Sequence, residues 1–126
     1  MHERVETTRA WLLYDGACQK GNARACANLA GMLGSSPRAL ELYDYACRHD
    51  VPEACTKLGR LRSDRAAELY EIACSLGDAA GCIELGRLHE GALDVRRAAE
   101  LYQRACVRGE LSGCTQLDRL HGRHAY

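Results

Sequence analysis

The residues best able to do chemistry in this chain are its eight cysteines, an even number and several times ordinary usage for 126 residues. They form four units of two cysteines eight residues apart: Cys18 and Cys26, Cys47 and Cys55, Cys74 and Cys82, Cys106 and Cys114. Such cysteines can cross-link, bind a metal or react as thiols. Zinc sites prefer about two to four residues between ligands and a second converging pair, which this pattern lacks. It favours a structural role in an oxidising compartment, with no metal and no cofactor.

The first cysteine of each unit ends a motif that occurs four times, Arg-Ala-x-x-Leu-Tyr-x-x-Ala-Cys, beginning at Arg9, Arg38, Arg65 and Arg97. Its Ala, Leu and Ala fall at i, i+3 and i+7 on one face of a helix, which the tyrosine beside the leucine widens. We name this predicted helix helix B. We call the equivalent residues of the four copies a column. Two columns of helix B are expected in the core: Leu13, Leu42, Leu69 and Leu101, then Tyr14, Tyr43, Tyr70 and Tyr102.

The second cysteine of each unit begins another motif with helical spacing, Cys-x-x-Leu-x-x-Leu, with Met once in the last place. We name the helix that it predicts helix A. Two apolar columns of helix A are also expected in the core: Leu29, Leu58, Leu85 and Leu117, then Met32, Leu61, Leu88 and Leu120.

The residues that link the two motifs are typical of a tight turn. Gly21, Gly77 and Gly109 stand three residues after the first cysteine, where a helix that ends in a left-handed residue places glycine, and Asp50 takes this place once. Residues that cap helix N-termini stand before the predicted helices: Asn22 and Asp78 for helix A, and Ser36, Ser63 and Asp94 for helix B.

Two short helices with so short a link run antiparallel, and such a hairpin buries its apolar face only by stacking on other hairpins. The sequence therefore predicts about seven short helices. The first is a lone helix B that ends at Cys18, and the last is a lone helix A over 113–126.

The run Ala-Cys-x-x-Gly-x-x-x-Gly-Cys-x-x-Leu-Gly-x-Leu, from Ala73 to Leu88, resembles Sel1-like repeats and, more narrowly, the Helicobacter cysteine-rich proteins. The resemblance covers about 9–120. It implies an all-α fold, a right-handed αα solenoid of short repeats related to tetratricopeptide repeats, with one domain over 1–126, about four shortened repeats and terminal half-repeats as caps. It also implies that the two cysteines of each unit form a disulfide within a hairpin. Geometry favours the same four bonds, because a tight turn brings the two Cα atoms within the roughly 4.4 to 6.8 Å that a disulfide needs.

The repeats are shorter than those of the resembled family. Successive tyrosines of the motif lie 29, 27 and 32 residues apart, and the shortening falls between helix A and the next helix B. Leu58 and Leu69 are 11 residues apart, against 16 for Leu85 and Leu101.

Composition excludes several partners. Seventeen basic and seventeen acidic residues give no net charge, so the chain as a whole has no electrostatic reason to bind nucleic acid. No run approaches the roughly 18 apolar residues of a membrane span, so membrane insertion is not expected. The start, Met1 to Glu6, lacks the features of a signal peptide. We expect a secreted or periplasmic protein whose export signal was removed; the alternative is a cytoplasmic protein with eight buried thiols.

Helix A supplies the candidate binding site. Beside its core columns it keeps two further columns that share a face: Asn28, Lys57, Glu84 and Gln116, then Gly31, Arg60, Arg87 and Arg119. Helix A usually lines the concave surface of such solenoids. We therefore predict a groove in which Arg60, Arg87 and Arg119 present guanidinium forks to the carboxylates of a partner. The alternative is ordinary solvated arginine.

The charges on helix B are interpreted as solvated surface. Its outer face is acidic, and Arg38 with Glu41, Arg65 with Glu68, and Arg97 with Glu100 are i, i+3 pairs of opposite sign. The tyrosine column is interpreted as core and not as a stacking site for a cofactor.

The function that these observations favour is a monomeric scaffold or adaptor that binds a protein or peptide, an acidic segment being the candidate. The resemblance implies one alternative, a weak β-lactam-binding protein or β-lactamase. No serine of the chain has a lysine three residues on and no Lys-Thr-Gly occurs, so we expect no enzyme and no catalytic residue. A redox-active thiol protein is a third possibility.

Overall fold

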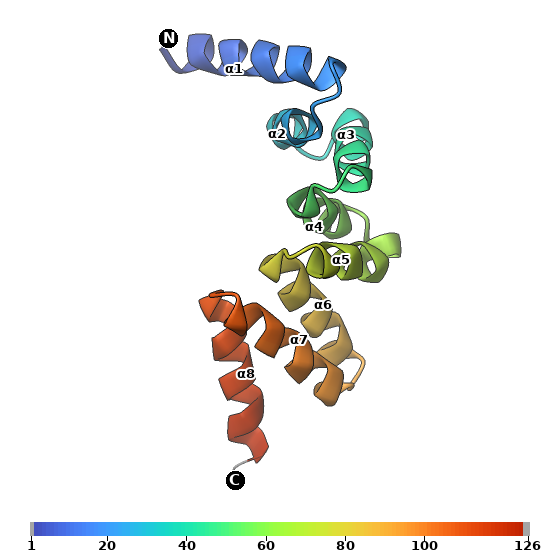
Figure 1. Ribbon diagram of the computed structural model, residues 1–126, viewed down its shortest axis with the longest axis vertical. Helices are drawn as coiled ribbons and strands as arrows, with labels where there is room; N and C mark the ends of the chain where they lie inside the picture. The colour runs from blue at the N-terminus through green and yellow to red at the C-terminus, as the bar shows by residue number, and fades with distance from the viewer. Residues whose placement is uncertain (1, 125–126) are drawn as a thin grey trace.

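The computed structural model describes residues 2–124 of the chain and the side chains of 7–122. This part consists of eight α-helices and one short 3-10 helix, without a β-strand. The helices are α1 (His2–Gln19), α2 (Ala23–Leu33), α3 (Pro37–Arg48), α4 (Pro52–Leu61), α5 (Ala66–Ser75), α6 (Ala79–Gly91), α7 (Val95–Val107) and α8 (Leu111–His124). They follow one another in chain order along the long axis of the molecule, with the two termini at opposite ends (Figure 1).

The helical repeat is confirmed, with one helix more than expected. The odd-numbered helices are the four copies of helix B, and the even-numbered helices are the four copies of helix A. Each helix packs on the next along the chain, so the structure is an αα solenoid. Seven helices were too few because four copies of helix B and four copies of helix A make eight helices. The last helix begins at Leu111, two residues before the expected 113–126, and residues 125–126 lie outside the described part.

The turn from each helix B into helix A has the predicted chemistry. Gly21, Gly77 and Gly109 have positive φ angles of 96°, 105° and 93°, and Asp50 has 66° at the equivalent place. Residues other than glycine rarely adopt this backbone conformation, and aspartate tolerates it better than most. These four left-handed residues reverse the chain within a few residues and bring the two cysteines of each unit together.

Three of the predicted N-caps bond as expected. The side chains of Asn22, Ser36 and Asp94 accept from the backbone N–H three residues on. Asp78 occupies the cap position of α6, but its carboxylate accepts instead from the hydroxyl of Thr56 at 2.5 Å. Ser63 was wrong as the cap of α5.

The link that contains Ser63 is too short for a free loop. Ser63 begins the 3-10 helix η1 (Ser63–Arg65), and α5 starts directly after it at Ala66. The shortened interval between Leu58 and Leu69 is therefore filled by a tight helical turn.

Each of the four cysteine units forms a disulfide, and no cysteine of the described chain is free. The bonds join Cys18 to Cys26, Cys47 to Cys55, Cys74 to Cys82, and Cys106 to Cys114, with Cα atoms 4.6 to 4.7 Å apart. The pairing within hairpins is confirmed. The two inner bonds are buried, whereas one or both cysteines of the two outer bonds are partly exposed.

Two buried clusters, one around α2 to α5 and one around α5 to α8, form the core. The tyrosine column is buried in three of its four copies, Tyr43, Tyr70 and Tyr102, as expected. Tyr14 of α1 is half-buried and Leu13 is exposed. The expectation for Leu13 was wrong because no helix of the described chain precedes α1.

The second apolar column of helix A was mostly wrong. Met32, Leu61 and Leu88 are exposed, and of this column Leu120 alone is buried. The reason lies two places earlier, where Gly59 and Gly86 are buried against tyrosine rings of the next helix B. A Cβ on Gly59 would lie 2.6 Å from the ring of Tyr70. Helix A therefore turns its glycine face inward, and this turn places Leu61 and Leu88 outside.

Candidate functional site

The predicted site lies on the helix A layer. Besides the contacts between successive helices, α4 contacts α6 and α6 contacts α8, and no comparably close pair occurs among the copies of helix B in the described chain. In a curved stack the inner layer is the one whose members approach each other most closely. This spacing supports the prediction that helix A lines the inner surface.

Arg60 of α4 and Arg87 of α6 meet at one carboxylate, that of Glu84. The Nε of Arg60 lies 3.5 Å from Oε2 of Glu84, and the Nη1 of Arg87 lies 3.0 Å from Oε1. The two arginine side chains are 50% and 57% exposed, whereas that of Glu84 is 17% exposed. Each guanidinium thus keeps nitrogen atoms that face solvent while Glu84 holds the pair in place.

Glu84 forms a side-chain hydrogen bond with a buried tyrosine, Tyr70. Burial, then the negative charge of Glu84, raises the pKa of Tyr70, and a side-chain hydrogen bond between the two acts in the same direction. Tyr70 keeps its proton at neutral pH and fixes the carboxylate that gathers the two arginines.

A hollow of about 230 Å³ opens beside this cluster. It is lined by Arg60, Glu84 and Arg87 and by Glu110 and Ser112, which stand on either side of the first residue of α8 in the sequence. Its lining is mostly polar and charged, and Ala80 and Ile83 are its apolar members. The hollow therefore suits a charged or hydrogen-bonding group better than an apolar one.

Arg119, the third arginine of the predicted column, is engaged inside the protein. Its Nη2 lies 2.6 and 2.7 Å from the two carboxylate oxygens of Glu90, and its Nε donates to Gln116 at 3.0 Å. The hydroxyl of Tyr102 donates to Glu90 at 2.8 Å. Burial, then this bond, raises the pKa of Tyr102 to about 12, while the bond to Glu90 raises the pKa of Arg119. This cluster ties α6, α7 and α8 together.

The structure thus divides the predicted binding residues between two places. The structure brings Arg60, Glu84 and Arg87 to one hollow, and it places Gln116 and Arg119 in a separate tie. Asn28 of α2 and Lys57 of α4 are exposed on the same helix layer.

Two features of the helix A surface went unpredicted. Glu90 captures Arg119 from 29 residues away, a contact that helical spacing cannot reveal. The exposed Leu61 and Leu88 directly follow Arg60 and Arg87, so each arginine has an apolar neighbour in sequence. The glycine before each arginine was the available signal, since it marks the inward face of the helix.

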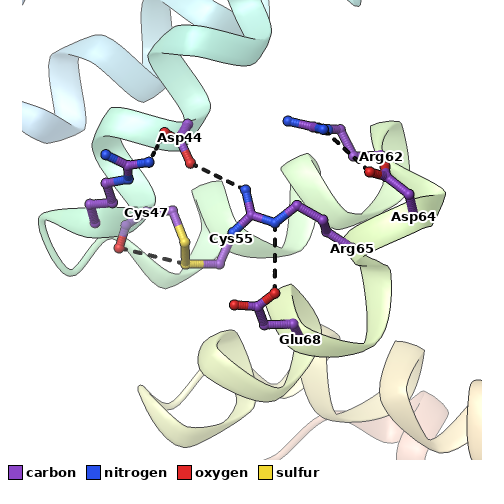
Figure 2. Close-up of polar contacts among 8 residues, drawn as sticks. Asp44, Cys47, Cys55, Arg62, Asp64, Arg65 and Glu68 are labelled. Carbon is purple, nitrogen blue, oxygen red and sulfur yellow. Dashed lines mark hydrogen bonds and ion pairs between the residues drawn. A yellow bond between two sulfur atoms is a disulfide. The ribbon is translucent and has the colours of Figure 1, made fainter.

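The helix B surface is charge-balanced by its own arginines. Figure 2 shows Arg65 between two carboxylates, Asp44 of α3 at 3.8 Å and Glu68 of α5 at 3.7 Å, and the nearby pair of Arg62 and Asp64. The expected pairs Arg65 with Glu68 and Arg97 with Glu100 are confirmed.

The expected pair of Arg38 and Glu41 was wrong. Arg38 instead pairs with Asp15 of α1 at 2.9 Å and lies over the ring of Trp11, 5.9 Å from its centroid. The reason is that α1 offers Arg38 both a carboxylate and an aromatic face.

The described residues contain no group of three or more metal-ligating side chains. None of the helices in 2–124 is both long and apolar enough to cross a bilayer.

The fold is that of a helical repeat solenoid. It is similar to the crystal structure of a Sel1 repeat protein from Oxalobacter formigenes, with a TM-score of 0.78 and 20% identity over 86% of this chain and 53% of that one. It is also similar to c5321, a protective antigen of uropathogenic Escherichia coli strains displaying an SLR fold, with a TM-score of 0.76 and 21% identity over 85% of this chain and 27% of that one. The chain thus spans about half the length of the first structure and about a quarter of the second.

No family model and no curated protein matches the chain. Together with the fourfold motif, the likeness to the two structures shows that the chain has the Sel1-like repeat fold.

Proposed function

We propose that this chain is a protein- or peptide-binding scaffold that acts in an oxidising compartment and takes an acidic segment of its partner on the helix A layer. Sel1-like repeat folds are commonly protein-interaction scaffolds. The observation that supports this surface best is the meeting of Arg60 and Arg87 at Glu84, with solvent-facing guanidinium nitrogens beside a polar hollow. Arginine forks of this kind bind carboxylates through paired hydrogen bonds.

The partner segment that fits this surface carries both charge and apolar side chains. Leu61 and Leu88 are exposed next to the arginines, and Lys57 adds a cation on α4. A segment that alternates acidic and apolar residues can bury the leucines while its carboxylates reach Arg60 and Arg87. Burial of the apolar side chains supplies affinity, and the ion pairs with the arginines fix the position of the segment along the surface.

The test uses a fluorescent probe peptide that alternates glutamate and leucine. Arg87→Glu should weaken its binding by more than about 1 kcal/mol and reduce the salt dependence, because one of the two cations beside the hollow becomes a repulsive group. Glu84→Gln should strengthen binding, because the change removes the internal carboxylate that competes for both arginines. The matched control is Glu68→Arg on α5, which reverses an exposed charge that does not line the hollow and lies on the helix B layer. An equal loss of binding in the control would place the site on helix B instead.

In this proposal Arg119 and Gln116 position α8, whereas the exposed Asn28 stays a candidate contact for the partner. Arg119 already satisfies Glu90, so we expect it to hold α8 against α6 and not to contact the partner. We also propose that the protein acts without catalysis. Hydrolysis of a chromogenic β-lactam by the pure protein is the assay that would overturn that statement.

Secretion or residence in the periplasm is the cellular setting that we propose. Four disulfides suggest an oxidising environment, since reducing compartments keep such thiols free. A cytoplasmic protein would keep the same eight cysteines reduced. We also propose that the stack forms one monomeric domain over 1–126.

A further inference from the structure

A hollow of about 330 Å³ lies where the hairpin of α1 and α2 meets α3. We call it the Glu41 hollow. Its lining residues come from the turn of that hairpin and from α3, and they include Cys18, Gly21, Cys26, Glu41, Leu42 and Tyr45. The lining combines the apolar surface of a disulfide, a leucine and an aromatic ring with one carboxylate. Such a lining differs from the mostly charged hollow on the helix A layer.

The carboxylate in this lining lacks the partner that its counterparts have. In α5 and α7 the glutamate at this place of the motif pairs with the arginine that begins the motif: Glu68 with Arg65, and Glu100 with Arg97. In α3 the equivalent Arg38 pairs with Asp15 of α1 instead. Glu41 therefore has no ion pair or hydrogen bond to any side chain of the described residues. Its charge is available to a cation from outside.

The apolar side chains beside Glu41 are also incompletely covered. Leu69 of α5 and Leu101 of α7 are at most 1% exposed, whereas Leu42, at the same place in α3, is partly exposed. Tyr45 is 36% exposed, and its ring packs on the ring of His49 with the centroids 4.2 Å apart. Because Tyr45 stands four residues after Glu41 on one helix, the two side chains share a face. Uncovered apolar surface and an unpaired carboxylate thus meet at one hollow.

We propose that the Glu41 hollow binds a small organic cation, a protonated amine carried by an aromatic body. The ammonium group pairs with the carboxylate of Glu41, and the aromatic body lies against Leu42 and the ring of Tyr45. Burial of that apolar surface supplies affinity, and the ion pair selects an amine over a neutral ligand. Small-molecule sites have volumes of roughly 300 to 1,000 Å³, so a hollow at the lower end of that range suits an amine with a single ring.

The test is an NMR titration of the isotope-labelled, oxidised chain with 2-phenylethylamine. The amide signals of Gly21, Leu42 and Tyr45 should shift and saturate. 2-Phenylethanol has nearly the same shape without the charge and should bind about three- to fivefold more weakly, which is the size of a partly exposed ion pair. Butylamine keeps the charge without the ring, as a lysine side chain does, and should also bind more weakly because it buries less apolar surface.

Three variants locate the site. Glu41→Gln should weaken the binding of 2-phenylethylamine about three- to fivefold and leave that of 2-phenylethanol unchanged, because it removes the charge alone. Glu68→Gln is the matched control at the same place of the motif in α5, and it should change neither affinity. Tyr45→Arg gives α3 the residue type that α7 carries at Arg104. It should abolish binding of the amine, because a cation four residues after Glu41 can pair with it.

The outcomes decide between a ligand site and an ordinary solvated carboxylate. Saturable shifts confined to the hollow, together with the loss in Glu41→Gln, would support the proposal. A titration without saturable shifts would overturn it, and so would equal binding of the amine and the alcohol or of the amine and butylamine. An unchanged affinity in Glu41→Gln would do the same. Because the Glu41 hollow shares no residue with the hollow at Arg60 and Arg87, Arg87→Glu should not alter amine binding, and either proposal can fail without the other.

Discussion

The first and fourth copies of the helix B motif differ in burial although their key residues are the same. In α7 the leucine and tyrosine, Leu101 and Tyr102, are 0% exposed, whereas in α1 Leu13 is 67% exposed and Tyr14 is half-buried. α7 packs on both α6 and α8, while α1 packs on α2. The difference teaches that neighbours decide the energetic role of each motif residue, as expected for a stack in which each unit contacts the units beside it.

The buried copy also gains polar partners that the exposed copy lacks. Tyr102 packs on Gly86 and donates to Glu90, which in turn binds Arg119 of α8. Asp15 and Trp11 of α1 instead contact Arg38 at the surface. Surface ion pairs of this kind contribute at most about 1 kcal/mol. The C-terminal end of the stack is therefore held by a core and the N-terminal end mainly by its turn and disulfide.

The largest effect that this comparison predicts is on stability. Leu101→Ala should lower the free energy of unfolding by about 2 to 5 kcal/mol, because it removes buried contacts and leaves a cavity. Leu13→Ala, the same change in the first copy, should cost less than about 0.5 kcal/mol, because the side chain is exposed. Urea unfolding followed by circular dichroism measures both.

Similar losses at the two positions would break the comparison. Such a result would mean that Leu13 is covered in solution. Measuring Leu13→Ala at two protein concentrations separates self-association from intrinsic stability.

The disulfides offer an intermediate effect. Every bond closes a loop of the same length and contributes on the order of 2.5 kcal/mol in the chain-entropy model, so differences between them come from their surroundings. Cys74 and Cys82 are buried in a hairpin that has another hairpin on either side, whereas Cys106 and Cys114 lie in the last hairpin and are partly exposed. Replacing the first pair with alanine should lower Tm about 5 °C more than replacing the second pair.

Differential scanning calorimetry of the two double variants checks that order. We expect that loss of its disulfide lets the last helix, α8, open before the other hairpins, which should broaden the transition more than shift it. Equal shifts in Tm would argue that the stack unfolds as one cooperative unit from end to end.

Much of the fold could be predicted because its determinants are local. The motif spacing, the left-handed residues after each first cysteine and the caps at Asn22 and Ser36 all act within one hairpin. The disulfide pairing was implied by the resemblance to Sel1-like cysteine-rich proteins and favoured by the tight turn between the two cysteines of each unit. Contacts between hairpins were harder, and the outward position of Leu61 and Leu88 depends on a tyrosine ring that belongs to the next helix.

The candidate site was predicted in part for the same reason. Sequence spacing placed Arg60 and Arg87 on one face, and the structure adds that they meet at Glu84. It could not show that Arg119 is held by Glu90, because that contact depends on how α8 packs on α6. Whether the arginines bind a partner remains a prediction.

The smallest predicted effect is a change of stability with pH that comes from Tyr102, in the buried fourth copy of the helix B motif. The pKa of Tyr102 is about 12 in the folded chain, above the ordinary tyrosine value of 10.0, because of burial first and the bond to Glu90 second. A group whose pKa is higher in the folded than in the unfolded chain stabilises the folded protein fully below the unfolded pKa. This contribution is lost as the pH rises through the folded pKa. The folded state should therefore lose about 1 kcal/mol by about pH 11 from this group alone. Tyr102→Phe should start less stable, because Glu90 loses a donor, but its stability should fall less steeply between about pH 10 and 12. Urea unfolding of both proteins across that range decides it, and parallel curves would show that the hydroxyl of Tyr102 titrates no differently in the folded and unfolded chains.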